Sequence, residues 1–323
     1  MGENNMNLDM ISLIVSNTLI YSAPLIFTAL GGVFSERSGV VNVGLEGIMV
    51  VGAFTATVVN LTFAESLGNM TIWVSLLAAG LAGLIFSLIH ALATVNLRAD
   101  HIISGTVLNL IAPALCIFLT RVLNNGKGQT DGVSKSFGYY TFPVLSEIPV
   151  IGDIFFSRTS LPAYIGILFA FLMWFIIFKT DFGLRLRSVG ENPQAADTLG
   201  INVYKMRYIG IMLSGLLGGI GGGVLLQSIS MNFSHVTVAG QGFIAMAAMI
   251  FGKWNPIGAM LAAIFFGFAQ SLSIVGSQIP LISNIPSVFL QIAPYVITIF
   301  ILVSFVGHAN GPASIGKNYI KTK

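Results

Sequence analysis

The sequence is divided into apolar runs that are long enough to cross a lipid bilayer, and this pattern constrains the fold more than any other feature. A spanning α-helix needs about 20 predominantly apolar residues. Nine runs approach or exceed this length, at residues 10–33, 40–64, 71–95, 102–123, 161–179, 207–229, 239–252, 257–276 and 286–306. Because hydrocarbon cannot hydrogen-bond to the backbone, runs of this length must form helices. We therefore predict an all-α polytopic membrane protein with about nine (eight to ten) transmembrane helices, built as a single domain over residues 1–323.

The composition agrees with this class and excludes several others. Of the 323 residues, 55% are hydrophobic and 8% are charged, whereas soluble domains have about a quarter charged residues. The net charge of +3 is too small to indicate binding to nucleic acid. The single cysteine, Cys116, and four histidines without clustered ligand spacing predict neither disulfides nor a metal site. The first ten residues contain no Lys or Arg, so the first run is expected to remain as a span.

The distribution of basic residues predicts the orientation in the membrane. Nine crossings place the termini on opposite sides. With the N-terminus outside, the cytoplasmic side holds eleven of the fifteen Lys and Arg residues, and the outer side holds Arg121, Lys127, Lys135 and Arg158. Cytoplasmic loops carry the excess of basic residues, so we predict an external N-terminus and a cytoplasmic C-terminus. The loop 124–160 then lies outside, as an external gate, a docking surface or a plain solvated connection, and the loop 180–206 lies inside.

A carboxylate lies inside an apolar segment at residues 39–54. A charge at the bilayer centre costs at least about 2.5 kcal/mol on insertion scales, so Glu46 is expected to face protein or a watery cavity. Glycines on both sides of it indicate a helix that is interrupted and restarts, which is tolerated at membrane depth where the backbone is buried in protein. The alternative is a helix that simply begins near Gly44, with Glu46 in its first turn, where the helix dipole favours a negative charge.

The two halves of the chain, approximately 10–123 and 207–306, show a short internal similarity. Aligning Gly47 with Gly242 places Glu46 over Gln241, so each half has a polar residue beside glycine at the head of an apolar helix. The two units run in opposite directions in the predicted topology. This is the pattern of an inverted repeat whose broken helices surround a transport path at the midplane; coincidence is the alternative. An amide at the equivalent position indicates that a polar group, and not a proton carrier, is required.

Polar residues within the predicted spans are the candidates for contact with a transported solute. A hydroxyl-rich solute needs hydrogen-bond donors and acceptors, and an aromatic ring can stack on a base. The candidate substrate-pathway residues are Asn42, Glu46, Asn109, Gln241, Phe243 and Gln270. For each polar residue, a hydrogen bond between helices is the alternative interpretation. His90 in the third run either faces a pathway or packs against a neighbouring helix, and we favour the packing role.

The sixth run contains glycines at every fourth position, Gly215, Gly219 and Gly223. Small residues on one helix face allow close approach of a second helix in a membrane. We therefore predict a tightly packed helix pair at this run.

The largest inner loop contains the signals of a short helix. Asn192 is a suitable cap, Pro193 suits the first turn, and Gly200 can end the helix in a left-handed conformation. The flanking residues are basic. The loop is either an ordinary amphipathic connector or a docking helix for a cytoplasmic partner.

Two strings of this sequence resemble a known family: GENPQAADTLGINV from Gly190 and SERSGVVNVGLEG from Ser35. They are similar to permeases of ATP-binding-cassette (ABC) importers of the ribose and branched-chain amino acid type. Within that family the chain most resembles permeases of nucleoside importers that use a basic-membrane-protein-type lipoprotein. The resemblance covers most of residues 20–305, although Gln194 replaces the usual leading Glu of the coupling-helix motif. The coupling residues that it implies are Gly190, Glu191, Asn192, Pro193, Ala195, Ala196 and Gly200.

The resemblance also implies partners. A permease of this kind, in the bacterial plasma membrane, pairs with a second and distinct permease, with two cytoplasmic ATPases that carry ATP and Mg²⁺, and with an external lipoprotein. This chain itself is expected to bind no cofactor and to be no enzyme. Residues Gly311 to Lys317 nearly form a phosphate-binding loop, but Asn318 replaces the Ser or Thr that holds magnesium, and no domain follows.

The expected function is therefore transport of nucleosides, purine nucleosides such as guanosine first among them, from the lipoprotein to the cytoplasm. A simple sugar or a branched-chain amino acid is the alternative cargo. A second class remains open, an ion-coupled secondary transporter in which Glu46 carries a proton. A membrane enzyme is disfavoured, because the sequence contains no recognisable catalytic nucleophile and no cluster of metal ligands.

Overall fold

The computed structural model describes residues 2–276 and 311–321, together with Phe289, Ile292 and Val296. In these residues the regular elements are helical, with one isolated β-bridge between Tyr140 and Thr159. The predicted all-α class is confirmed. Six helical segments in the described part are long and apolar enough to cross a membrane, and one of them, Leu45–Asn96, contains two successive helices. The ninth predicted run, 286–306, lies outside the described residues except at three positions, so the number of crossings stays a prediction.

The helices follow the predicted runs closely. Their bounds are α1 Gly2–Arg37, α2 Leu45–Leu67, α3 Thr71–Ala91, α4 His101–Leu123, α5 Leu161–Lys179, α6 Asp181–Glu191, α7 Pro193–Thr198, α8 Val203–Leu225, α9 Gln241–Phe251 and α10 Pro256–Val275. Short π-helical turns extend α3 and α8, at Leu92–Asn96 and Leu226–Ser230. The sequence analysis missed α6, whose first turn is capped by Thr180: its Oγ1 accepts a hydrogen bond from the N–H of Gly183 at 3.3 Å.

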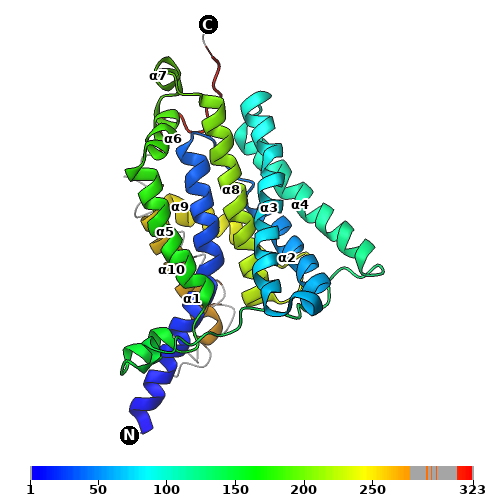
Figure 1. Ribbon diagram of the computed structural model, residues 1–323, viewed down its shortest axis with the longest axis vertical. Helices are drawn as coiled ribbons and strands as arrows, with labels where there is room; N and C mark the ends of the chain where they lie inside the picture. Colours follow the sequence, from blue (N-terminus) through cyan, green and yellow to red (C-terminus); the bar gives the residue numbers. More distant parts are fainter. Residues whose placement is uncertain (1, 277–288, 290–291, 293–295, 297–310, 322–323) are drawn as a thin grey trace.

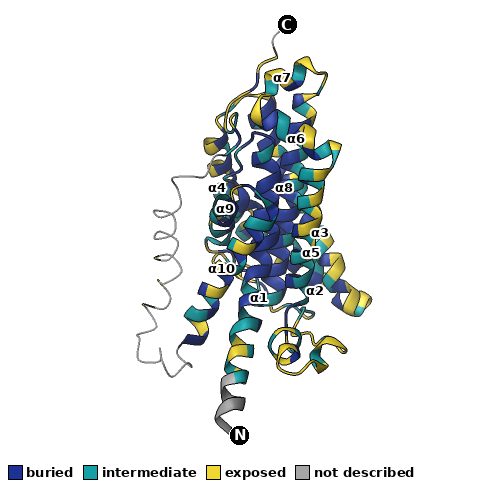
Figure 2. Ribbon diagram, turned by 90° about the vertical axis from the view of Figure 1, so that its left-hand side faces the viewer, coloured by how far each residue is buried: buried dark blue, intermediate teal, exposed yellow. Residues whose placement is uncertain are grey.

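Helix α8 lies in the middle of the bundle, against α1, α2 and α3 (Figure 1). In the most apolar stretch of α8, 72% of the residues are buried, compared with 50% in that of α1. Glycines allow this packing. A Cβ atom added to Gly52 or Gly83 would lie 2.7 Å or 2.8 Å from Cα of Gly219, so no side chain fits there. The predicted close helix pair is confirmed, and α8 uses its glycines against both α2 and α3. Figure 2 shows the buried residues concentrated along this axis.

The two chain termini lie at opposite ends of the bundle (Figure 1). The loop 124–160 lies at the same end as the N-terminus: Ser12 Oγ donates a hydrogen bond to the carbonyl of Asp153 at 2.8 Å, and Asn60 at the far end of α2 donates to the carbonyl of Lys135 at 2.7 Å. Helices α6 and α7 lie at the other end, with the C-terminal residues. Which end faces the cytoplasm stays a prediction from the basic residues.

The predicted start of the second span, 40–64, is wrong. Helix α2 begins at Leu45, and residues 38–44 are not helical but run into the bundle. A Cβ atom on Gly44 would lie 3.1 Å from Cδ1 of Leu108, which is seven residues, about 10 Å, along α4 from its first residue. The interpretation of a helix that breaks and restarts is therefore replaced by its alternative: the helix begins after Gly44, with Glu46 in the first turn, at a point well inside the protein.

Candidate transport site where two helix N-termini meet

The N-terminal ends of α2 and α9 are in direct contact inside the bundle. A Cβ atom on Gly242 would lie 2.5 Å from Cα of Glu46, so glycine is required for this approach. From this point α2 runs toward the end of the molecule that holds the loop 124–160. Helix α9 runs the other way, alongside α1, and ends near Arg37, whose Nε donates to the carbonyl of Trp254 at 2.8 Å. The two helices, of 23 and 11 residues, thus diverge in opposite directions from one contact.

The carboxylate of Glu46 joins the two helices. Its Oε1 accepts a hydrogen bond from the N–H of Gly240 and its Oε2 accepts one from the N–H of Gly242, both at 2.7 Å. These N–H groups are free donors at the start of α9, which has no side-chain cap of its own. The positive ends of both helix dipoles point at the carboxylate, an arrangement that favours its negative charge. Glu46 is therefore bonded within the protein on both oxygens.

The start of α2 is capped in turn by Asn109 of α4. Its Oδ1 accepts from the N–H of Gly47 at 2.8 Å, and its Nδ2 donates to the carbonyl of Val43 at 2.9 Å. An amide can satisfy a donor and an acceptor at once. Asn109 thus fixes the entry of the non-helical segment into α2, and Glu46 and Asn109 form one continuous network with the glycines.

Gln241 and Gln270 form a second pair beside this network. The Nε2 of Gln270 donates to Oε1 of Gln241 at 3.2 Å, and a longer reciprocal contact of 3.5 Å joins the other two atoms. Both side chains are half-buried. Two residues further along α9, Phe243 is 45% exposed. Of the six predicted pathway residues, Phe243 is exposed, Glu46, Asn109, Gln241 and Gln270 are half-buried, and Asn42 is buried.

Asn42 lies deeper in the protein. It is 1% exposed, and its Nδ2 donates to Oγ of Ser214 on α8 at 2.9 Å. Its Oδ1 is buried and has no hydrogen-bond partner within the part of the chain that the structure describes. In this conformation Asn42 joins the 38–44 segment to α8. The segment 38–44 connects Asn42 to Glu46 and Asn109, but the buried side chain of Asn42 has no surface that a solute could reach.

Two histidines that sequence reasoning did not connect with the site hold the same segment. His90 Nε2 donates to the carbonyl of Val41 at 2.9 Å, and its Nδ1 accepts from Oγ of Ser104, also at 2.9 Å. The N–H of Val41 donates to Nδ1 of His101 at 3.3 Å. The predicted packing role of His90 is confirmed. His101 was missed because its partner lies 60 residues away in the sequence.

The predicted short helix of the inner loop is α7. The Oδ1 of Asn192 accepts from the N–H of Ala195 at 3.0 Å, and Pro193 occupies the first turn. Gly200 ends the segment with φ of +80°. Ala196 is buried, whereas Leu199 is 81% exposed. The local structure that the sequence predicts at these positions is confirmed; the coupling role stays a prediction.

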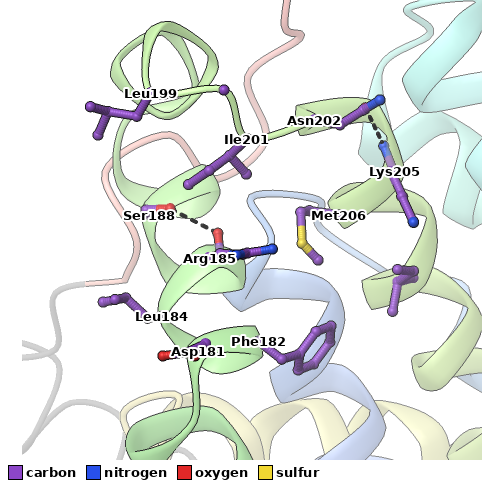
Figure 3. Close-up of a pocket in the computed structure, with 12 residues that line it drawn as sticks. Asp181, Phe182, Leu184, Arg185, Ser188, Leu199, Ile201, Asn202, Lys205 and Met206 are labelled. Atoms are coloured by element: carbon purple, nitrogen blue, oxygen red, sulfur yellow. Dashed lines mark hydrogen bonds between the residues drawn. The ribbon is translucent and has the colours of Figure 1, made fainter.

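The remaining coupling residues lie at the junction of α6 and α7. Gly190 is buried, and a Cβ atom there would collide with the carbonyl of Arg37. Glu191 is exposed. A groove of about 1020 Å³ opens between α6, the residues 199–202 that follow α7, and the start of α8 (Figure 3). Its lining combines apolar side chains with the charged residues Asp181, Arg185 and Lys205. The groove and α7 lie at the end of the molecule away from the N-terminus, apart from the network around Glu46.

Comparison with known proteins identifies the family. The sequence model described as branched-chain amino acid transport system / permease component matches residues 14–305. The chain belongs to this permease family. The permease is 62% identical over 313 residues to the nucleoside ABC transporter permease protein NupC of Lactococcus lactis, covering 97% of this chain and 98% of that one. It is 56% identical to the guanosine ABC transporter permease protein NupQ of Bacillus subtilis, with the same coverage.

A more distant relative is the guanosine ABC transporter permease protein NupP of Bacillus subtilis. It is 27% identical over 296 residues, covering 90% of this permease and 81% of that protein. The family that the sequence strings resemble is thus confirmed. The chain is a multi-pass membrane protein of an ABC permease family.

Proposed function

We propose that this permease is the membrane subunit of an ATP-driven importer of nucleosides, with purine nucleosides such as guanosine as the first cargo. The observation that carries the proposal is the 62% identity, over nearly the whole of both chains, with a permease named for nucleosides. The 56% identical relative named for guanosine supports the purine class. Transport of a simple sugar or a branched-chain amino acid has less support, because both of these relatives are named for nucleosides.

The permease pairs with a second and distinct permease chain. Support comes from Bacillus subtilis, where two chains of different sequence are both named as guanosine permeases. Two cytoplasmic ATPase subunits bind ATP and Mg²⁺, and an external lipoprotein delivers the cargo. This chain binds no cofactor of its own.

The contact between α2 and α9 is the part of this chain that controls the path of the cargo. Half-helices of opposite direction that meet inside a bundle are typical of inverted repeats around a midplane site. Glu46 in the first turn of α2 is hydrogen-bonded directly to the start of α9. Movement of one repeat half relative to the other therefore acts directly on this contact. The half-buried Gln241 and Gln270 present amides to the cargo, and Phe243 presents a ring on which a base can stack.

Energy comes from ATP and not from a proton carried by Glu46. Both oxygens of this carboxylate already accept backbone hydrogen bonds, and two helix dipoles favour its charged form. Protonation would remove an acceptor from a buried donor, which costs about 1–3 kcal/mol. A carboxylate used in this way holds the structure together and is poorly suited to release and take up a proton in each cycle.

Movement of the ATPases reaches the permease through α7. The exposed Leu199 and the capped ends of the helix give a short rigid element on the cytoplasmic face. Its preceding helix, α6, is held against α1 at Gly190, so a force on α7 is applied close to the end of α1.

The cargo assignment is tested by competition. Cells that express the complete transporter take up radiolabelled guanosine, and a hundredfold excess of unlabelled adenosine, inosine, glucose or leucine is added in parallel. We expect the purine nucleosides to suppress uptake and glucose and leucine to leave it unchanged. Suppression by glucose or leucine, with no effect of the nucleosides, would contradict the assignment.

A further inference from the structure

The C-terminal residues 311–321, called the tail below, follow the cytoplasmic end of the bundle and are bound to it at several points. From its sequence alone, this segment resembles a phosphate-binding loop that lacks the Ser or Thr for magnesium, followed by basic residues. In the structure it contacts three connections that are distant in the sequence: the segment after α1, the connection between α3 and α4, and the junction of α6 and α7. A tail that is bound to three separate connections is a structural part of this end of the bundle.

The first attachment is to the end of α6. The N–H of Ser314 donates to the carbonyl of Gly190 at 2.9 Å, and its Oγ donates to the carbonyl of Glu191, also at 2.9 Å. These carbonyls lie immediately before Asn192, the cap of α7. The next residues cross to the segment after α1, where the N–H of Gly316 donates to the carbonyl of Gly39 at 3.0 Å.

The second attachment is Tyr319, whose ring lies under α7. Tyr319 is 5% exposed and belongs to an apolar cluster with Val189, Ala196, Val203 and Met206. Its ring centroid lies 5.6 Å from that of Tyr204. Ala196 is the buried side chain of α7, so Tyr319 packs on the one face that this short helix turns toward the protein. Its hydroxyl is buried without a hydrogen-bond partner among the described residues, so the packing of the ring is what holds Tyr319 in this cluster.

The third attachment is Asn318, which reaches the start of α4. Its Nδ2 donates to the carbonyl of Arg98 at 2.7 Å, and its Oδ1 lies 3.2 Å from Nε2 of His101. Because Nδ1 of His101 accepts from the N–H of Val41, the neutral ring carries its proton on Nε2 and donates it to Asn318. Asn318 is therefore joined through one imidazole to Val41.

Val41 leads directly to the candidate site. Two residues later, the carbonyl of Val43 is bound by Asn109, and Glu46 follows in the first turn of α2. The shared apolar cluster, the peptide bond between Asn318 and Tyr319, and the hydrogen bonds of His101 thus connect α7 to the segment that enters α2. A second route is also present, because α7 contacts α6, and Gly190 at the end of α6 lies against Gly39 at the start of the same segment.

We propose that Asn318 and Tyr319 are positioning residues that join the coupling helix α7 to the start of α2, so that displacement of α7 moves the Glu46 contact with α9. The proposal rests on the proposed function, since it presupposes that α7 receives the ATPase movement. Tyr319 follows α7 through apolar packing, and Asn318, its neighbour in the chain, transmits the displacement through His101. The tail is then a link in the transport cycle.

The test measures uptake of guanosine per ATP hydrolysed by the complete transporter in proteoliposomes. Tyr319→Ala removes the packing on Ala196, and Asn318→Ala removes both polar contacts at an exposed position. We expect both variants to assemble, to hydrolyse ATP, and to import roughly fivefold less cargo per ATP or worse, the scale of an ordinary coupling energy. Tyr319→Phe keeps the ring, and Ile320→Ala changes a neighbour that is 56% exposed; both should retain the wild-type ratio. A wild-type ratio in Tyr319→Ala and Asn318→Ala would overturn the proposal.

Hydrogen exchange of the same assembled variants separates this link from general loosening. In Asn318→Ala we expect faster amide exchange at residues 41–47 while residues 193–199 remain protected, since Tyr319 still holds α7. Unchanged exchange at 41–47 would contradict the link. If Tyr319→Ala does not assemble, the results for Asn318→Ala alone decide whether the proposal holds. Failure of the proposed function is distinguishable, because the wild-type transporter would then show no ATP-dependent guanosine uptake, while the exchange result still reports whether the tail joins the two segments.

Discussion

The carboxylate of Glu46 accepts a hydrogen bond from the N–H of Gly242 at 2.7 Å, although 196 residues separate the two in the sequence. This contact places the first turn of α2 against the first turn of α9. The positive ends of two helix dipoles would repel each other at such a distance, and the shared carboxylate compensates both. The relationship explains why a charge is kept inside an apolar segment and why glycine lies opposite it.

The first prediction concerns Glu46. Glu46→Gln keeps one acceptor oxygen but turns an NH2 group toward the second backbone donor, which is then left unsatisfied at a cost of about 1–3 kcal/mol. We expect a lower melting temperature of the complex and reduced but substantial guanosine uptake. Glu46→Ala removes both acceptors and should abolish uptake. Complete loss in Glu46→Gln, with normal assembly, would contradict a structural role and favour the proton-coupled alternative.

The second prediction concerns Gly242. Gly242→Ala places a methyl group 2.5 Å from Cα of Glu46, so the helix N-termini must separate. Overpacking of this kind costs about 1–3 kcal/mol, and we expect a loss of thermal stability together with a loss of uptake. Gly128→Ala is the matched control, because a Cβ atom there meets nothing within 4 Å. Equal stability and uptake in the two variants would show that the helices are not in contact as described.

A third prediction tests α7. Gly200 has φ of +80°, and a Cβ atom there meets nothing within 4 Å. Gly200→Glu therefore introduces backbone strain of about 1 kcal/mol and adds a charge beside α7. Deletion of 192–199 removes the helix. Both variants should reach the membrane at wild-type levels and lose uptake, as measured by surface labelling and guanosine transport. Normal uptake in either one would exclude the coupling assignment; Gly128→Glu, which adds the same charge in the loop 124–160 where a Cβ atom meets nothing within 4 Å, serves as the control.

Membrane orientation gives a fourth prediction. Cys116 is 2% exposed, so the native protein should not react with a membrane-impermeant maleimide. Gly128→Cys in the loop 124–160 should be labelled in intact cells, and Lys321→Cys in the tail only after permeabilisation. The reverse pattern would invert the orientation that the basic residues predict.

Much of the local structure follows from the sequence. Asn192, Pro193 and Gly200 lie within nine residues of the sequence, so the cap and the end of α7 were predictable from turn chemistry. The glycines of α8 predicted close packing in the same way, because their spacing repeats along one helix face. Such signals are contained in a short stretch of chain.

The long-range partners could not be predicted. The sequence identified Glu46 as unusual but not its binding to α9, because any free helix N-terminus in the chain offers equivalent donors. The role of Asn318 was missed for a similar reason: the residue was read against a nucleotide-binding motif, whereas its partners Arg98 and His101 come from a connection more than 200 residues earlier. Contacts of this kind depend on the packing of the whole bundle.

The energy source is the central claim, and uptake into proteoliposomes tests it most directly. This permease is reconstituted with its partner subunits, and guanosine uptake is measured with ATP on the ATPase side, and separately with a proton gradient and no ATP. The account predicts uptake with ATP that is lost when a non-hydrolysable analogue replaces it, and none driven by the gradient. Guanosine uptake by this chain in the absence of ATPase subunits, driven by the proton gradient, would contradict the account.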